Sequence, residues 1–199
     1  MKFRILITFL ISFLSMGEAK VDEKAPEFSL LNQDNERVLL SQFKGKNVVL
    51  EWTNHECPFV KRHYETNNMQ ELQKNYTDQN VVWLSIVSSA PKKQGFINNK
   101  QAKELTVQRG AHPSHVLIDE NGDVGRLYKA KTTPHMYVID GSGMLRYNGA
   151  IDNLGMTGAL FNTDLSKAKN YVKLAIDALL GGSDVLEKET RPYGCSVKY

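Results

Sequence analysis

The sequence predicts an α/β protein in which a central mixed β-sheet is flanked by helices. Two observations predict this class. Apolar and β-branched runs of strand length alternate with helical patterns along the first part of the chain, and a hairpin with a closing helix follows them. With 199 residues, of which 41% are hydrophobic and 24% charged, the chain has the length and apolar content of one globular domain.

The strands are expected where apolar and β-branched residues run together between turn signals. In chain order they are a short strand within 38–46 that ends in a turn, then 47–52, 81–87, 115–119, 136–140 and 144–147. Gly141-Ser142-Gly143 separates the last two, and glycines in so short a loop are typical of a β-hairpin.

The helices are expected at 58–76, at 100–109, in a short stretch ending at Tyr128, and from Thr163 or Asp164 to Leu180. Pro58 suits a first helical position, because the N–H that proline lacks has no partner inside the helix there. Gly110 closes the second helix and Gly181 the last one. The remaining residues, 183–199, are expected to form a polar tail.

Residues 1–19 have the layout of a secretory signal peptide. Lys2 and Arg4 precede a stretch at 5–14 in which eight of ten residues are apolar, and small residues stand at positions −3 and −1 of a cut after Ala19. The apolar run is shorter than the roughly 20 residues that span a bilayer. We expect a secreted or periplasmic mature chain with no stable membrane insertion; an uncleaved membrane anchor is the alternative.

The charge of the chain gives no reason to expect a nucleic-acid partner. The formal net charge is +3, and it falls to +2 when two basic residues and one acidic residue leave with the signal segment. A protein that follows a phosphate backbone carries a larger and clustered basic excess.

Cys57 stands directly before the predicted helix that begins at Pro58, and a short loop joins it to the strand that ends near Thr53. At this position the unpaired N–H groups and the positive end of the helix dipole face the sulfur. The thiolate is the reactive form, and a helix N-terminus lowers the pKa of a cysteine from about 8.5 to values as low as about 3.5. Lys61 adds to that effect and Glu56 opposes it.

Thr133-Pro134 precedes the first hairpin strand, where proline cannot donate to a sheet ladder. The order of strand, loop, cysteine at a helix start and Thr-Pro before a hairpin resembles the thioredoxin fold. The string Asn-His-Glu-Cys-Pro-Phe-Val-Lys at 54–61 and the Ala-Pro-x-Phe opening at 25–28 are similar to peroxiredoxin-like redoxin-domain proteins, related to alkyl hydroperoxide reductase and thiol-specific antioxidant. The resemblance covers roughly 25–180, so we expect the domain at 20–182.

The resemblance implies thiol redox chemistry without a cofactor, and a cis proline opposite the reactive cysteine. It implies that Thr133 and Pro134 line the site. The further site-lining candidates are residues close to Cys57 in sequence: Thr53, Asn54, His55, Pro58 and Phe59. The chain departs from the family patterns in two places. Val60 stands where thioredoxins have their second cysteine. Leu50 and Asn54 stand where peroxiredoxins have the proline and threonine of Pro-x-x-x-Thr-x-x-Cys, and Thr53 is one place off.

Cys195, in the tail, is the second of only two cysteines. A thiolate that attacks a peroxide or a disulfide is left as a sulfenic acid or a mixed disulfide, which a second thiol resolves. Cys195 is a candidate for that role. A permanent Cys57–Cys195 disulfide, or a Cys195 that stays unpaired or pairs with another chain, are the alternatives.

The expected function is that of an exported thiol oxidoreductase, with catalytic Cys57 and Cys195, acting on a protein disulfide or a hydroperoxide and regenerated by a thiol reductant. No metal is expected in that mechanism. A non-catalytic module with a fixed disulfide is the competing interpretation. A copper protein is another, because His55, His63 and His135 fall near Cys57 in the predicted fold.

Overall fold

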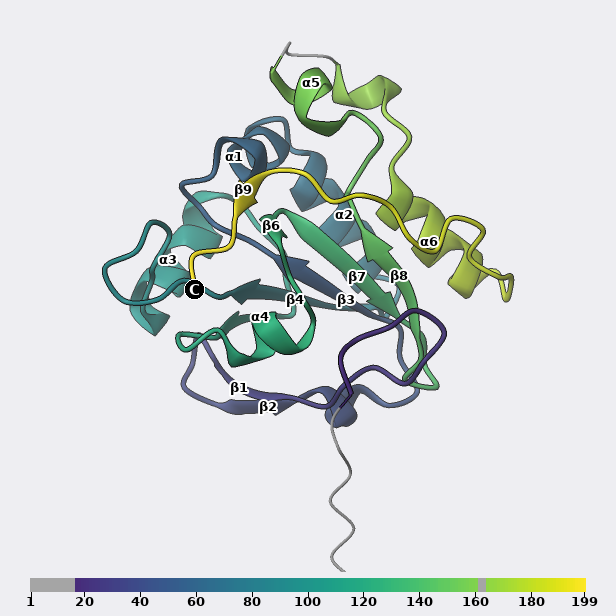
Figure 1. Ribbon diagram of the computed structural model, residues 1–199, viewed down its shortest axis with the longest axis horizontal. Helices are drawn as coiled ribbons and strands as arrows, with labels where there is room; N and C mark the ends of the chain where they lie inside the picture. Colours follow the sequence, from purple (N-terminus) through teal and green to yellow (C-terminus); the bar gives the residue numbers. More distant parts are fainter. Residues whose placement is uncertain (1–16, 161–163) are drawn as a thin grey trace, which may run out of the picture.

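A computed structural model describes residues 17–160 and 164–199, and over these ranges its centre is a seven-stranded sheet of order β2-β1-β5-β4-β3-β7-β8 (Figure 1). The strands are β1 Ser29–Asn32, β2 Arg37–Leu39, β3 Val48–Trp52, β4 Val82–Val87, β5 His115–Ile118, β7 His135–Ile139 and β8 Leu145–Gly149. A separate two-stranded sheet pairs β6 Thr132–Thr133 with β9 Cys195–Ser196.

The sheet is mixed: β3 and β5 run parallel to β4, whereas β7 runs antiparallel to both β3 and β8. The helices are α1 Pro58–Glu65, α2 Asn68–Thr77, α3 Asn99–Gln108, α4 Asp123–Leu127, α5 Gly155–Leu160 and α6 Tyr171–Leu180, with 3-10 turns η1 Leu40–Phe43 and η2 Leu165–Lys167. The mixed sheet with flanking helices confirms the predicted fold class.

The core has two layers because successive residues of a strand point to opposite faces of the sheet. In β3, Val49 packs with α1, α2 and α6, whereas Val48 and Leu50 pack on the other face with α4. All residues of β3 and β4 are buried. The two strands therefore form the rigid centre from which the Cys57 loop leaves.

Two predicted helices differ in the structure. The helix expected at 58–76 is divided into α1 and α2 at Asn67, whose φ of 61° is left-handed and breaks the helical hydrogen bonding. The last helix begins after Asn170, whose side chain accepts a hydrogen bond from the Lys173 N–H. Asp164 instead caps the 3-10 turn η2, and Thr163 lies outside the described residues.

The predicted strand within 38–46 is confined to β2, and η1 takes its place from Leu40 onward. β1 was not predicted from the sequence; it pairs with both β2 and β5 and extends the sheet at that edge. The expected strands at 47–52, 81–87 and 115–119 and the hairpin are present, with ends shifted by a residue or two.

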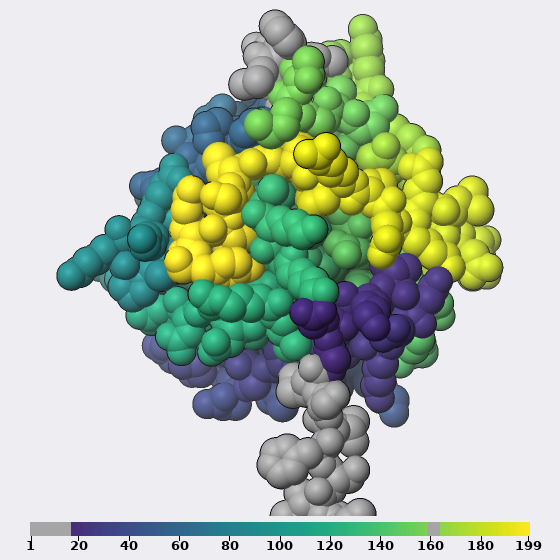
Figure 2. Space-filling model, viewed as in Figure 1, coloured from purple at the N-terminus to yellow at the C-terminus, as the bar shows by residue number. Residues whose placement is uncertain are grey.

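The predicted polar tail is docked along the molecule; we call residues 183–199 the C-terminal strap. In Figure 2 it is part of the yellow band that crosses one face. The Thr190 N–H donates to the Asn148 carbonyl (3.1 Å), the Val197 N–H to the Lys131 carbonyl (3.2 Å), and the Lys198 carbonyl accepts from the Ala90 N–H (2.9 Å). The strap thus contacts segments that lie far apart in sequence.

Most of the predicted signal segment, residues 1–16, lies outside the described residues. Ala19, the expected cleavage position, is buried, and its N–H donates to the Leu127 carbonyl (3.2 Å). Within the ranges that the structure describes, no helix is long and apolar enough to cross a membrane.

Candidate active site

Cys57 is the N-cap of α1, with extended backbone angles and Pro58 at the first helical position. The loop from β3 is fixed by its own hydrogen bonds. The Cys57 N–H donates to the Asn54 carbonyl (3.1 Å), and the Asn54 side chain accepts from the Glu56 N–H (2.9 Å). Strand, loop and helix therefore hold the sulfur at one place.

The Thr133–Pro134 peptide bond is cis and lies against this sulfur. The Cys57 thiol donates a hydrogen bond to the Thr133 carbonyl at 3.1 Å, across 76 residues of sequence. The side chains of Cys57 and Thr133 are both buried. The two sequence features that were 76 residues apart thus form one site.

Cys195 lies over the same point. In the β6–β9 pair it is opposite Thr133, and the Cys57 and Cys195 thiols are hydrogen-bonded to each other. Both cysteines are free thiols, Cys57 fully buried and Cys195 partly exposed. The structure is thus the dithiol form, with the strap lying across the nucleophile.

The two thiols differ in how readily they ionise. Burial opposes ionisation of Cys57, but hydrogen bonds from the Cys195 thiol, the Val60 N–H and Thr133 outweigh it, so the pKa of Cys57 is below its ordinary value. Burial, the hydrogen bond with Cys57 and the nearby Cys57 charge raise the pKa of Cys195 to about 12. Cys57 is therefore the sulfur that becomes a thiolate first, and Cys195 keeps its proton.

The other expected site residues separate into two groups. Pro58 is exposed at the helix start, and the half-buried Phe59 ring packs edge-on against Tyr193 of the strap, 6.0 Å between centroids. Asn54 is buried beside Gly95 and donates to the Gln94 carbonyl (3.3 Å), so its side chain serves the loop and not the sulfur.

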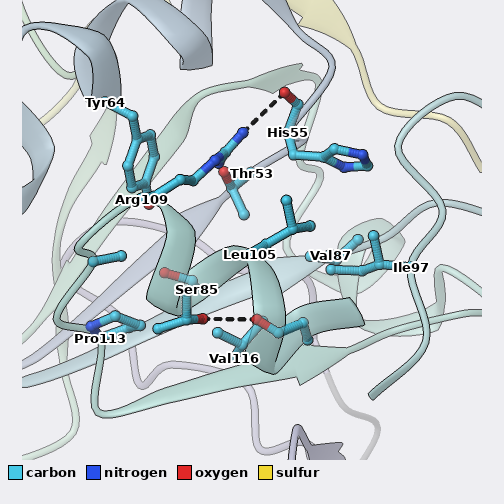
Figure 3. A pocket seen from close by; sticks show the side chains of 13 residues that line it. Thr53, His55, Tyr64, Ser85, Val87, Ile97, Leu105, Arg109, Pro113 and Val116 are labelled. Atoms are coloured by element: carbon cyan, nitrogen blue, oxygen red, sulfur yellow. Dashed lines mark hydrogen bonds between the residues drawn. The ribbon is translucent and has the colours of Figure 1, made fainter. Parts of the chain in front are cut away.

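Thr53 and His55 line a cavity of about 40 Å³ between the loop, α1 and α3, and Cys57 is not among its lining residues (Figure 3). The Thr53 hydroxyl and the His55 Nδ1 atom have no hydrogen-bond partner there. Arg109 closes one side: it donates to the His55 carbonyl (2.9 Å) and lies over the Tyr64 ring, 4.6 Å from the centroid. Burial lowers the pKa of His55, with Arg109 and Lys61 adding and Glu56 opposing.

The remaining histidines named for the copper interpretation have partners of their own. His63 is buried between Asn68 (2.9 Å) and Asp152 (3.9 Å), and His135 is buried with its Nε2 atom 2.8 Å from the Asn148 side chain. Among the described residues, no group of three His, Cys, Asp or Glu side chains is arranged to hold a metal ion.

Two buried polar features near the site were not predicted from the sequence: the carboxylate of Glu51 and the Tyr193–Asp152 pair. Glu51, in β3, is fully buried and accepts hydrogen bonds from Tyr64, Gln73, Trp83 and Ser85 at 2.8–3.1 Å. An acidic residue inside an apolar strand was the available signal. The Tyr193 hydroxyl donates to the Asp152 carboxylate at 2.6 Å. No local sequence pattern predicts the Tyr193–Asp152 pair, because its members are 41 residues apart.

The mixed sheet, the cysteine at a helix N-cap and the cis proline opposite it define a thioredoxin-like protein. The sequence belongs to the AhpC/TSA family, whose model matches residues 21–148. This confirms the resemblance stated from the sequence. The chain is therefore a thioredoxin-fold redoxin. It belongs, broadly, to the thiol-dependent oxidoreductases.

Individual relatives agree with this assignment. The thioredoxin-like protein YneN of Bacillus subtilis (strain 168) is 28% identical over 125 residues, which cover 62% of this chain and 68% of that protein. The thiol-disulfide oxidoreductase ResA of Halalkalibacterium halodurans is 23% identical over 137 residues, 62% of this chain and 77% of that protein. The crystal structure of an uncharacterised conserved protein from Geobacillus kaustophilus is 27% identical, covers 90% of this chain and 92% of that one, and has a TM-score of 0.75.

Proposed function

We propose that the protein is an exported thiol-disulfide oxidoreductase in which the Cys57 thiolate attacks a substrate disulfide and Cys195 resolves the product. The observation that supports this most directly is the pair of free thiols in hydrogen-bond contact, of which Cys57 has a lowered pKa and Cys195 a raised one. This difference in pKa supports the two roles. Cys57 is the nucleophile because the thiolate is the reactive form, and Cys195, which keeps its proton, reacts in the second step.

The chemistry balances with two sulfur atoms and no cofactor. The Cys57 thiolate forms a mixed disulfide with one sulfur of the substrate and expels the other as a thiolate, which takes up a proton. Cys195 then loses its proton, attacks the Cys57 sulfur and releases the second substrate thiol. The substrate disulfide is reduced by two electrons, Cys57 and Cys195 become a disulfide, and a thiol reductant restores both.

Disulfide exchange is favoured over hydroperoxide reduction by the surroundings of the sulfur. Peroxiredoxins use a threonine three residues before the cysteine, and here that position is Asn54, whose side chain bonds within the loop. Thr53 lines a separate cavity that Cys57 does not line, and its hydroxyl has no hydrogen-bond partner. The name of the relative ResA also supports disulfide exchange.

We further propose that residues 1–19 direct export and that the mature protein, with its domain at 20–182 and the strap at 183–199, is secreted or periplasmic. The support is the signal-peptide layout of the N-terminus. Disulfides form in an oxidising compartment, so substrates for a reduced cysteine pair would be present there.

Reaction of the reduced protein with a model peptide disulfide and, separately, with hydrogen peroxide tests the proposal. Free thiols are counted with time and the products are mapped by mass spectrometry. We expect the peptide disulfide to produce a Cys57–Cys195 bond, and Cys195→Ser to stop at a mixed disulfide on Cys57 without turnover. Faster oxidation by peroxide than by the peptide would favour a peroxidase instead.

The competing interpretation, a non-catalytic module with a fixed disulfide, predicts a different result. In that case the Cys57–Cys195 bond forms once and resists mild reduction, and Cys57→Ser has no effect on any exchange reaction. Either result would overturn the catalytic proposal.

A further inference from the structure

The strap is what hides the proposed nucleophile. Cys57 has no exposed surface, and Cys195 of the strap packs against the buried cluster that contains it. Gly194 has a φ of +136°, and a Cβ atom there would lie 2.1 Å from the Thr133 carbonyl oxygen. The strap backbone is therefore in direct contact with the peptide bond that precedes Pro134, and a substrate disulfide reaches Cys57 only when this part of the strap moves.

The side-chain hydrogen bond nearest to Cys195 on its N-terminal side is made by Tyr193. Its ring packs edge-on against Phe59, and its hydroxyl donates to Asp152 Oδ1 at 2.6 Å. Tyr193 and Asp152 are 6% and 2% exposed, so the hydrogen bond is shielded from water. A hydrogen bond to a buried carboxylate is among the stronger ones in proteins.

Asp152 is itself fixed in place. The same Oδ1 atom accepts from the Leu154 N–H (3.0 Å), and Oδ2 lies 3.9 Å from Nε2 of His63 in α1. Since α1 also begins at Cys57, Asp152 connects the strap to the helix whose start holds the nucleophile. The Tyr193–Asp152 hydrogen bond thus joins the strap, two residues before Cys195, to a carboxylate that also contacts α1.

On the other side of Cys195 the strap is held at its end. The Tyr199 hydroxyl donates to the Ala130 carbonyl (2.8 Å), and its ring lies 4.5 Å from the Arg126 guanidinium. Cys195 thus lies between these two side-chain contacts, and its own backbone pairs with Thr133 in the β6–β9 ladder. Loss of either contact increases the motion of the segment between them, and the contact at Tyr193 is only two residues away.

We propose that Tyr193 and Asp152 are positioning residues: their hydrogen bond holds Cys195 at Cys57, so that opening of the strap controls entry of the substrate disulfide and its closure controls resolution. The proposal rests on the proposed function. The closed strap gives Cys195 a high effective concentration at the mixed disulfide, as expected of two groups held in place for reaction. The same closed strap excludes an external reagent.

The variant Tyr193→Phe keeps the ring against Phe59 and removes only the hydroxyl. It should speed the entry of an external reagent and slow the resolution by Cys195. Alkylation of Cys57 by a bulky maleimide in the reduced protein should become about tenfold faster. Formation of the Cys57–Cys195 bond from a preformed Cys57 mixed disulfide should become about tenfold slower. Both rates are measured by quenching and mass spectrometry of the full chain.

Tyr76→Phe is the matched control. It removes a hydrogen bond of the same chemistry, from the Tyr76 hydroxyl to Asp177 Oδ1 at 2.7 Å, between α2 and α6. We expect both rates to stay at the wild-type value in this variant. Asp152→Asn keeps an acceptor for the Tyr193 hydroxyl and should stay near the wild-type rates, whereas Asp152→Ala should behave as Tyr193→Phe does.

Wild-type rates in both Tyr193→Phe and Asp152→Ala would overturn the positioning role. Equal changes in Tyr193→Phe and Tyr76→Phe would also overturn it, because they would reflect a general loss of stability. A Cys57 that reacts with no disulfide in the wild type or in any variant would instead contradict the proposed function. The two failures are therefore distinguishable.

Discussion

At the residue scale, the site depends on the environment of two sulfur atoms. A cysteine at a helix start has a favourable position for a thiolate, but Cys57 is also buried, and burial alone would raise its pKa. The hydrogen bonds from Cys195, Val60 and Thr133 reverse that effect. The reactivity of Cys57 is thus shared between the helix start and the strap.

A direct consequence is that Cys195 lowers the pKa of Cys57 by donating to it. We expect Cys195→Ala to raise the pKa of Cys57 relative to the wild type, and Cys195→Ser, which keeps a donor, to raise it less. Each variant has a single cysteine, so the thiolate ultraviolet absorbance against pH reports Cys57 alone. A Cys57 that ionises at the same pH in both variants would contradict the assigned hydrogen bond.

At the scale of the elements, the strap packs against β6 and β8 through glycine positions that have no room for a side chain. Gly194 is the clearest, because its φ is positive and its neighbour is the Thr133 carbonyl, a backbone atom that cannot rotate away. The β6–β9 pair that places Cys195 therefore requires glycine at this position.

Gly194→Ala should displace β9 from β6 and expose Cys57. The expected result is faster hydrogen exchange of the Val197 amide, which donates to the Lys131 carbonyl, together with faster alkylation of Cys57. Gly45→Ala is the control, since Gly45 also has a positive φ but no atom lies within 4 Å of the added methyl group. Unchanged protection of Val197 in Gly194→Ala would show that the strap tolerates the side chain.

The sequence allowed the central elements to be predicted because their signals are local. The strands at 47–52 and 81–87 and the helix start at Pro58 follow from composition and from the chemistry of proline. The split at Asn67 and the late start of α6 at Asn170 did not follow. Asp164 and Asn170 are equally good caps, and only tertiary packing selects between them.

The site was predictable to a similar extent. Cys57, Thr133 and Pro134 were named from their positions, and the structure brings them together. Thr53 and His55 were named from adjacency in sequence, but the short loop turns them into another cavity. The docking of the strap arises from contacts such as Tyr193–Asp152, which unite distant parts of the chain.

At the scale of the whole molecule, two buried histidines link stability to pH. His63 lies in α1, next to Asp152 of the segment after β8, and His135 begins β7. Burial lowers the pKa of each from 6.5 to about 4, although Asp152 and Asn148 respectively oppose the shift. Both imidazoles are neutral in the folded protein at neutral pH.

Acid should therefore destabilise the fold. Between pH 6.5 and 4 the unfolded chain binds protons that the folded chain does not, so the stabilising contribution is complete above pH 6.5 and is lost as the pH falls toward 4. At pH 5 we expect a loss of about 2 kcal/mol for each histidine. Urea unfolding at pH 7 and pH 5 measures it, and His63→Gln should roughly halve the difference; a pH-independent free energy of unfolding would contradict this origin.

The position of Cys195 next to Cys57 also couples folding to the oxidation of the two cysteines. The folded chain holds the two sulfurs in contact, whereas the unfolded chain separates them by a long flexible segment, so oxidation is more favourable in the folded protein. In a thermodynamic cycle, the free energy by which folding favours oxidation has two measurable effects. It makes the oxidised protein more resistant to denaturant than the reduced protein, and it makes the native dithiol a stronger reductant. Any substitution that loosens the strap should weaken both by the same amount.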